Sequence, residues 1–262
     1  MNPAAEKRFN LAFNVFLVTG MIVAVTITTI FKLHQPGVKT FMLLLAAFGS
    51  VMGVVNTVLS ANGHILTFLF GLLDVLIATV VLLDNGIMGN FALHAFYFLP
   101  MQFIGFWQWR KRGAQVSSEG GEDTRVKARR LTARQWAWLV AGILVGIGVL
   151  YAVLYYVDVA QLDAGKIDSF NKSKILLDAV VMTLNIAGQV LLSFAFMEQW
   201  YIWILVNISS ISLWTVALLG GTGSGNAAVM LIKYIFYLLN SLNGLRIWLN
   251  LCKTQVSGSH SL

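Results

Sequence analysis

Five carboxamide side chains stand near the middle of long apolar stretches of this sequence. They are Gln102, Asn185, Gln189, Asn207 and Asn240. A polar group in apolar surroundings is costly unless it is hydrogen-bonded. A carboxamide both donates and accepts hydrogen bonds, so these residues could bind the hydroxyl and carboxamide groups of a ligand. A single such amide more often bonds only a neighbouring helix. Amides on four separate stretches therefore predict a shared ligand cavity.

Aromatic side chains fall on the same expected helix faces as the amides. Trp200, Trp203 and Asn207 are spaced by three and four residues, which places them on one face of an α-helix. Tyr237 and Asn240 are related in the same way. Trp and Tyr rings offer flat surfaces to a sugar or a heterocycle, and their faces also attract a cationic ring. We therefore include these aromatic residues in the candidate binding site.

Three further polar residues accompany these faces. Asn243 lies beside the face of Tyr237, and we include it in the candidate site. Asp178 shares a face with the amides of its stretch and lies nearer the outer end, where we expect a role at the entrance. Asp74 lies in the middle of its stretch. It has two interpretations, a partner for substrate or protons, or a hydrogen-bonded contact between helices.

The sequence lacks the residue patterns of common catalytic and metal sites. It contains no H-E-x-x-H motif, no His and Cys cluster with metal-ligand spacing, and no G-x-x-x-x-G-K-[ST] loop. A membrane enzyme acting on a lipid or quinone would need an acid–base constellation, but His64 and Asp74 share neither a helix face nor a depth. We therefore predict a protein that is not an enzyme and holds no cofactor or metal. A receptor or scaffold that binds without transport is a further alternative.

The composition identifies lipid as the main solvent of this chain. Of its 262 residues, 58% are hydrophobic and only 11% are charged, against about 25% charged in a typical soluble domain. The mean hydropathy is +0.76. These values exclude a soluble enzyme, a disordered protein and a disulfide scaffold, and the single cysteine, Cys252, permits no internal disulfide. The net charge of +7 does not indicate nucleic-acid binding, because the basic residues cluster in one loop between apolar stretches.

Eight apolar stretches have the roughly 20 residues that a transmembrane helix needs. They span residues 11–32, 41–60, 64–84, 88–109, 136–157, 175–197, 200–220 and 228–250. Their continuity excludes a transmembrane barrel, and the first run is too long for a cleaved signal peptide. Pro100 is expected to kink the fourth stretch. The sequence therefore predicts an all-α integral membrane protein with eight transmembrane helices.

The basic residues also predict the orientation in the membrane. Twelve of the 18 Lys and Arg residues belong to the side that holds both termini and the loop 110–135. The positive-inside rule places that side in the cytoplasm. The loop is polar and contains glycine, so we expect a solvated, mobile linker.

The two halves of the chain are similar when the sequence is slid along itself without gaps. One shift aligns both Gly105 with Gly244 and Trp109 with Trp248, so a Gly-x3-Trp pattern closes the third helix of each half. Because the halves are four spans apart, they form a parallel repeat, an arrangement of transporters that bind substrate at the repeat interface. The expected units are an additional N-terminal helix (1–40), a first three-helix repeat (41–109), a cytoplasmic basic loop (110–135), a linker helix with an outer loop (136–174), a second three-helix repeat (175–250) and a cytoplasmic tail (251–262).

The residues around Trp203 resemble a known family. The run WYIWILVNISS, with its W-x2-W-x3-N spacing, and the later run LNGLRIWLN resemble the second half of the PnuC family of bacterial nicotinamide riboside transporters. The runs FGLLD at 70–74 and QFIGFWQW at 102–109 are similar to its first half. The resemblance covers roughly residues 41–250.

This resemblance implies a fold, an activity and an assembly. Family members share the parallel three-plus-one-plus-three layout of the SWEET sugar transporters, here with an additional helix at the N-terminal end. The resemblance implies import of nicotinamide riboside by facilitated diffusion across the bacterial cytoplasmic membrane. Trapping by an intracellular kinase and a homotrimeric assembly are implied as well.

The resemblance also implies roles for the site residues. Trp203 and the neighbouring aromatic residues would pack against the substrate, and the five amides would bond its carboxamide and ribose hydroxyls. Gln102 stands where other members can carry Asn, and Pro100 is not a general family feature. These departures leave two alternatives, a carrier of a related vitamin such as thiamine and a SWEET-like sugar carrier.

Overall fold

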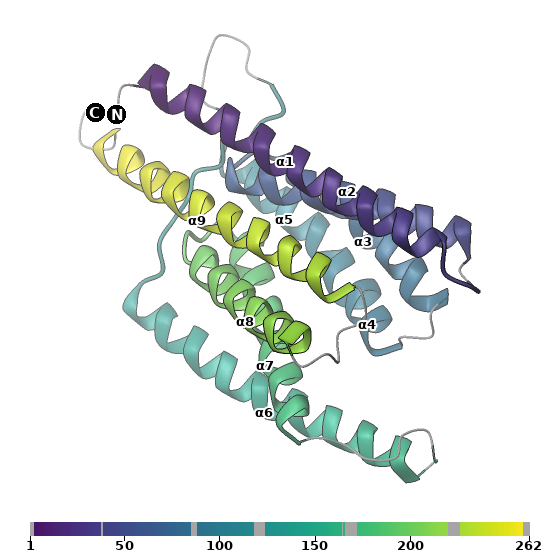
Figure 1. Cartoon of the computed structure of the whole chain (residues 1–262). Coiled ribbons are helices and arrows are strands. Elements are labelled where there is room, and N and C mark those ends of the chain that lie inside the picture. The colour runs from purple at the N-terminus through teal and green to yellow at the C-terminus, as the bar shows by residue number, and fades with distance from the viewer. Residues whose placement is uncertain are drawn as a thin grey trace.

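The computed structural model describes residues 3–37, 39–84, 88–117, 124–163, 165, 172–219 and 226–258. Its regular elements are α1 (Pro3–Leu33), α2 (Thr40–Ala61), α3 (Thr67–Asp84), α4 (Met88–Leu93), the single π-helical turn η1 (His94–Phe98), α5 (Leu99–Lys111), α6 (Ala133–Asp163), α7 (Lys172–Ser193), α8 (Gln199–Leu219) and α9 (Asn226–Gly258). The long helices form a bundle with α1 at one edge and α6 at the opposite edge (Figure 1). The expected all-helical fold class is confirmed.

The helices coincide with the eight stretches expected from hydropathy. Seven stretches form one helix each, and the fourth is a continuous run of α4, η1 and α5. Five helices within the described residues, α1, α2, α3, α6 and α7, have both the length and the apolar composition to cross a membrane. Large apolar side chains such as Phe31 and Leu144 are exposed on the bundle. A surface of this kind is suited to contact with lipid.

The fourth helix run is irregular at Pro100, although it does not break there. Proline lacks an N–H group, and its ring collides with the carbonyl four residues earlier in a regular α-helix. The π turn η1 ends at Phe98, two residues before the proline, and the Leu99 N–H donates to the His94 carbonyl. Widening the turn is a known way for a helix to absorb such a conflict. The expected kink is therefore a local π turn in an otherwise continuous helix.

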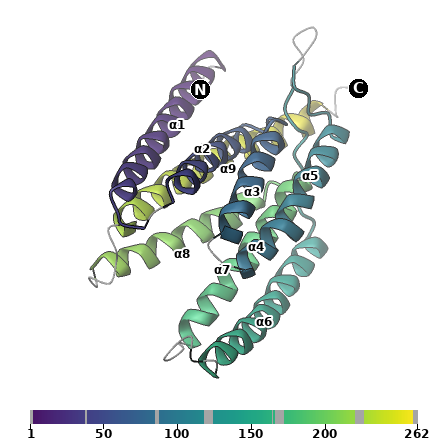
Figure 2. The same ribbon diagram turned by 90° about the vertical axis from the view of Figure 1, so that its right-hand side faces the viewer.

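Several helix contacts in the two halves of the chain correspond. α1 lies against α2, and α6 lies against α7. α2 contacts α9, and α7 contacts α5, so each half sends its last long helix to the other half. In Figure 2, α9 lies beside α2, and α6 lies beside α7 at the edge of the bundle opposite α1.

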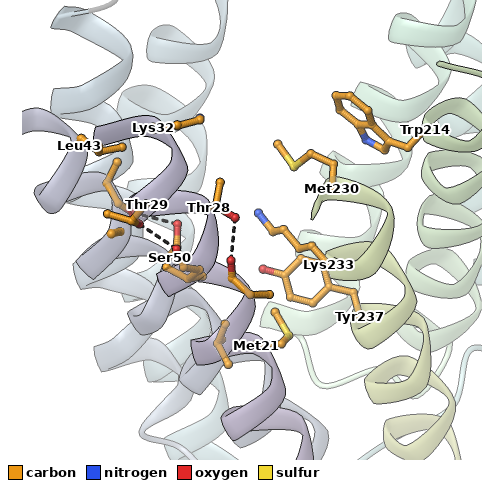
Figure 3. A pocket seen from close by; sticks show the side chains of 15 residues that line it. Met21, Thr28, Thr29, Lys32, Leu43, Ser50, Trp214, Met230, Lys233 and Tyr237 are labelled. Carbon is orange, nitrogen blue, oxygen red and sulfur yellow. Dashed lines mark hydrogen bonds between the residues drawn. The ribbon is translucent and has the colours of Figure 1, made fainter. Parts of the chain in front are cut away.

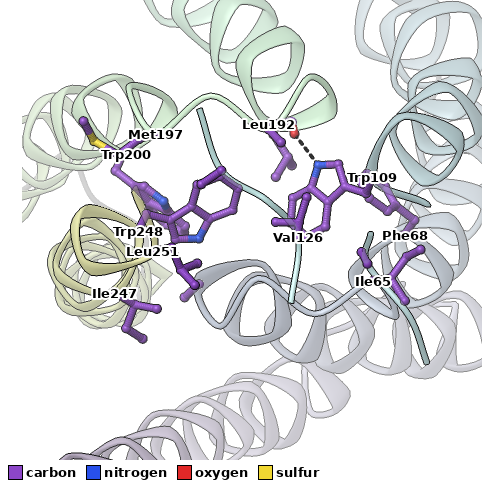
Figure 4. Close-up of a cluster of buried hydrophobic side chains, with 14 residues drawn as sticks. Ile65, Phe68, Trp109, Val126, Leu192, Met197, Trp200, Ile247, Trp248 and Leu251 are labelled. Atoms are coloured by element: carbon purple, nitrogen blue, oxygen red, sulfur yellow. Dashed lines mark hydrogen bonds between the residues drawn. The ribbon is translucent and has the colours of Figure 1, made fainter. Parts of the chain in front are cut away.

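One cluster of buried apolar side chains joins both halves at one end of the bundle (Figure 4). We call it the core cluster; it comprises Ala61, Ile65, Phe68, Trp109, Ala114, Val126, Ala128, Leu192, Ala195, Met197, Trp200, Ile247, Trp248 and Leu251. Its centre is a pair of fully buried tryptophans, Trp109 and Trp248, whose ring centroids are 5.5 Å apart. The Trp109 indole N–H donates to the Leu192 carbonyl at 2.8 Å, and the Trp248 indole N–H donates to the Ser60 carbonyl at 3.1 Å. Each half therefore supplies a hydrogen-bond donor to a helix of the other half.

The glycines of the Gly-x3-Trp pattern let aromatic rings into this cluster. A Cβ atom at Gly105 would lie 2.2 Å from the Phe68 ring, and one at Gly244 would lie 2.6 Å from the Trp200 ring. In both halves the glycine thus admits a ring from the preceding long helix. The tryptophan four residues later stands on the same helix face and fills the space beside that ring.

Residues 124–130, which we call the strap, lie across this end of both halves. The Val126 N–H donates to the Gly63 carbonyl and the Arg129 N–H donates to the Ala195 carbonyl, both at 3.0 Å. Gly63 and Ala195 have φ values of 70° and 58° and end α2 and α7 in the same left-handed turn. Val126 is completely buried. The strap is therefore packed against the bundle, which corrects the expectation of a solvated linker for this part of the loop; residues 118–123 lie outside the described residues.

We expect Trp109→Phe and Trp248→Phe to lower thermal stability by similar amounts. Each substitution removes the hydrogen bond of one buried indole N–H. The expected loss is about 1 kcal/mol, because the accepting carbonyl keeps its backbone donor, the Ala195 or the Gly63 N–H. Trp107→Phe, at an exposed position on the same helix as Trp109, is the matched control. Thermal unfolding of the purified protein in detergent is the measurement. An early transition in only one of the two core variants would contradict the reciprocal role.

Candidate ligand cavity

A cavity of about 270 Å³ lies between α2, α7, α8 and α9. We call it the aromatic chamber; its lining residues are Asn56, Thr57, Ser60, Val181, Asn185, Gln189, Leu192, Trp200, Trp203, Val206, Asn207, Ser210, Tyr234, Tyr237, Asn240 and Ser241. Amides, hydroxyls and aromatic rings make up most of this wall. Leu192 and Trp200 also belong to the core cluster, which therefore borders the chamber on one side.

A second cavity of about 610 Å³ adjoins the first. We call it the acidic chamber; its lining residues are Asn56, Asp74, Val75, Asn90, Leu93, His94, Phe98, Gln102, Leu154, Asp178, Val181, Met182, Asn185 and Gln189. It shares four residues with the aromatic chamber, among them Asn56, Asn185 and Gln189. The acidic chamber also reaches His94 and Asp178, near the ends of their helix runs that lie away from the core cluster.

The structure brings nine of the ten candidate site residues to these two chambers. They are Gln102, Asp178, Asn185, Gln189, Trp200, Trp203, Asn207, Tyr237 and Asn240. Asn243 lines neither chamber. Its Oδ1 atom instead accepts a hydrogen bond from Arg246 Nη2 at 2.9 Å. The same Arg246 nitrogen also donates to Asn10 of α1. Asn243 thus belongs to a polar contact between α1 and α9.

The chamber amides use their N–H groups on the protein. Asn207 Nδ2 donates to Ser241 Oγ at 3.0 Å, and Asn240 Nδ2 donates to the Thr57 carbonyl at 3.0 Å. Asn185 Nδ2 donates to the Val181 carbonyl at 2.8 Å. None of these three amide oxygens accepts a hydrogen bond within the described residues. The chambers therefore offer acceptors to a ligand that brings hydrogen-bond donors, such as hydroxyl or carboxamide N–H groups.

Two polar atoms beside the aromatic chamber are buried without a partner in the described part of the chain. They are Trp200 Nε1, a donor, and Asn240 Oδ1, an acceptor. Buried polar atoms are almost always hydrogen-bonded in folded proteins. A ligand or water in the chamber, with a small shift of these side chains, would supply the missing partners.

Sequence reasoning missed Asn56, which lines both chambers. Thr67 Oγ1 donates to Asn56 Oδ1 at 2.5 Å, so the side chain is held between α2 and α3. Gly71 keeps the space open, since a Cβ there would lie 2.5 Å from Gln102 Oε1 and 3.2 Å from Asn56 Nδ2. The signal for Asn56, an amide in the middle of an apolar stretch, was the one used for the other amides. Tyr234 was also missed, and it stands one turn before Tyr237 on α9.

A third cavity of about 260 Å³ lies between α1, α2 and α9 (Figure 3). Its walls are mainly apolar, and the hydroxyl groups of its threonines and its serine each donate to a carbonyl four residues earlier in their own helix. The charged side chains on its wall are those of Lys32 and Lys233. Tyr237 is the residue that this cavity shares with the aromatic chamber. No group of three or more His, Cys, Asp or Glu that could hold a metal ion occurs among the described residues.

Comparisons with known proteins assign this architecture to a family. The family model described as nicotinamide mononucleotide transporter matches residues 43–250. The nicotinamide riboside transporter PnuC of Neisseria mucosa is 34% identical over 209 residues, which cover 80% of this chain and 73% of that protein. PnuC of Haemophilus influenzae is 30% identical over 209 residues and covers 80% of each chain.

A solved structure agrees with the sequence comparisons. The crystal structure of the vitamin B3 transporter PnuC superimposes with a TM-score of 0.64 at 31% identity, covering 91% of this chain and 92% of the other. The resemblance expected from the W-x2-W-x3-N and Gly-x3-Trp runs is thereby confirmed. The chain is a multi-pass membrane protein that belongs to the PnuC transporter family.

Proposed function

We propose that this chain carries nicotinamide riboside across the bacterial cytoplasmic membrane. The observation that carries the proposal is the lining of the two chambers, which combines amides, hydroxyls, aromatic rings and two carboxylates. Nicotinamide riboside joins a positively charged aromatic ring, bearing a carboxamide, to a ribose with free hydroxyls. Aromatic faces suit the cationic ring, and amide oxygens suit the carboxamide and hydroxyl donors.

The same lining favours the riboside over the mononucleotide named by the family model. The mononucleotide carries an additional phosphate, and proteins hold phosphates with Arg, Lys or the N–H groups of helix N-termini. The described lining residues of both chambers include neither Lys nor Arg. A phosphate there would face Asp74 and Asp178 instead. The relatives from Neisseria mucosa and Haemophilus influenzae carry the riboside in their names.

All eight helix runs are proposed to cross the membrane, with both termini and the strap on the cytoplasmic side. We further propose the parallel three-plus-one-plus-three repeat, with α1 as the additional helix. Reciprocal hydrogen bonds support the repeat: Trp109 donates to a carbonyl near the end of α7, and Trp248 donates to one near the end of α2. The matching contacts of α2 with α9 and of α7 with α5 support it as well.

Transport is proposed to be uniport by alternating access, with the cargo trapped by phosphorylation in the cell. The core cluster and the strap separate the chambers from the cytoplasmic side, whereas the acidic chamber extends toward the opposite ends of α7 and the fourth helix run. This conformation therefore corresponds to one that receives cargo from outside. Release inward requires the core cluster to open between the halves. The homotrimer implied by the family resemblance stays a prediction.

A related vitamin is the second candidate cargo. Thiamine also contains a cationic aromatic ring, so the acidic chamber suits it too. A SWEET-like sugar carrier would use the amides and hydroxyls but would gain nothing from Asp74 and Asp178. The two carboxylates therefore favour a cationic vitamin over a neutral sugar.

We expect nicotinamide riboside to bind more tightly than thiamine, nicotinamide mononucleotide or glucose. The riboside alone combines the positive ring, the carboxamide and the ribose without a phosphate. Isothermal titration calorimetry of the purified protein with each compound is the measurement. Tighter binding of the mononucleotide or of glucose would overturn the proposed cargo.

Trp203→Ala and Asn207→Leu should each weaken binding of the riboside by roughly tenfold or more, which corresponds to about 1.4 kcal/mol. The first removes a ring of the aromatic chamber, and the second removes an amide oxygen acceptor. Trp138→Ala and Ser212→Ala are matched controls at exposed positions, and Ser212 lies on the same helix as Asn207. Wild-type affinity in both chamber variants would place the site elsewhere.

In proteoliposomes, we expect labelled riboside to exchange in both directions without ATP or a proton gradient. A uniporter equilibrates its cargo, because the same site is presented to each side in turn. Uptake is measured with and without a protonophore, and with unlabelled riboside inside the vesicles. Loss of uptake on collapse of the proton gradient would rule out uniport.

A further inference from the structure

Asp74 is the more deeply placed of the two carboxylates on the acidic chamber. It lies near the middle of α3 and is partly buried, whereas Asp178 lies near the start of α7 and is exposed. A carboxylate at this depth in a membrane protein is costly unless a cation, a hydrogen-bond donor or water accompanies it. The position of Asp74 therefore requires a partner.

Among the described residues, Asp74 has no partner in close contact. The Asp74 carboxylate accepts no hydrogen bond and forms no ion pair within 4.0 Å among them. Lys233 is the cation whose charge acts on Asp74. Its side chain, however, lines the cavity between α1 and α9, to which Asp74 does not belong (Figure 3). Asp74 therefore lines the acidic chamber without a close ion pair of its own.

The backbone around Asp74 positions its carboxylate beside the chamber amides. Gly53 of α2 lies so close that a Cβ there would be 2.8 Å from Asp74 Oδ2, so the glycine makes room for the carboxylate. Gly71 stands one turn earlier on α3, on the same face, and contacts the amides of Gln102 and Asn56. A ligand that bonds these amides would therefore lie within one helical turn of a negative charge.

We propose that Asp74 is the counter-ion of the cationic ring of the cargo and determines the preference for the charged form. This inference rests on the proposed function. Opposite charges attract strongly in a partly desolvated site, and a cation in the acidic chamber gives Asp74 a close partner in addition to the more distant charge of Lys233. The amides recognise the neutral groups of the cargo, and Asp74 recognises its charge.

The test compares nicotinamide riboside with its 1,4-dihydro form, which keeps the carboxamide and the ribose but has an uncharged ring. Asp74→Asn removes the negative charge with little change in shape. We expect this variant to bind the cationic riboside roughly tenfold or more weakly, by about 1.4 kcal/mol, and to change dihydroriboside affinity by about threefold at most. Calorimetry on the purified full-length protein measures both affinities.

Asp84→Asn is the matched control, since it removes the same charge from the same helix. Asp84 pairs with Lys39 at 2.6 Å and lines neither chamber, so we expect both affinities to stay within about threefold of wild type. Equal losses for both compounds in Asp74→Asn would mark a structural role and overturn the proposal, and so would unchanged affinity for the cation. If the wild-type protein binds neither compound, the proposed function itself fails, and the counter-ion role fails with it.

Discussion

Two reciprocal hydrogen bonds, from the indole N–H groups of Trp109 and Trp248 to backbone carbonyls of the opposite half, are the interaction on which the rest of the structure depends. Backbone groups at membrane depth must be paired inside the protein, because lipid offers no hydrogen bonds. Each bond brings a second donor to a carbonyl close to the end of α2 or α7, which also accepts the Gly63 or the Ala195 backbone N–H. The bonds thus tie the last helix of each half to a helix of the other half. The core cluster that forms around the two rings borders the chambers at one end.

The same requirement for pairing also shapes the chambers themselves. A carboxamide can be fixed by its N–H group while its oxygen remains available, and Asn185 and Asn207 are held in this way. The bond to the protein orients the amide before any ligand arrives, which reduces the entropy lost on binding. Neutral groups can therefore present directed acceptors at membrane depth without the desolvation cost of several charges. This explains how a chain with 11% charged residues builds a polar site.

Hydropathy was sufficient to place the helices, because continuous apolar runs in lipid have to be helical. Helical spacing correctly grouped the nine candidate residues that line the chambers. It could not exclude Asn243, because spacing alone does not reveal that Asn243 bonds Arg246, which also bonds Asn10 of α1. The ungapped shift that aligns the two tryptophans pairs Ser60 with Gln199, whereas the carbonyl that takes the equivalent place in the second half is that of Leu192. Leu192 lies near the end of α7, whereas Gln199 is the first residue of α8. The shift therefore pairs Ser60 with a residue of the wrong helix. The polar composition of the strap could not predict its packing. The strap is held by hydrogen bonds to the Gly63 and Ala195 carbonyls, which come together only in the folded bundle.

A carrier that equilibrates its cargo has to bind it weakly enough to release it on either side. Close bonds between arginine and a phosphate would oppose release, because such charge-assisted bonds are about twice as strong as neutral ones. Neutral amide and aromatic contacts are individually weak, and in the proposed alternating-access mechanism they can be lost one by one as the halves move apart. A single partly buried carboxylate, in the role proposed for Asp74, adds attraction that acts at longer range and does not require close contact. Selection of the cargo by shape and selection by charge can then reside in different residues, so that neither contact alone holds the cargo tightly.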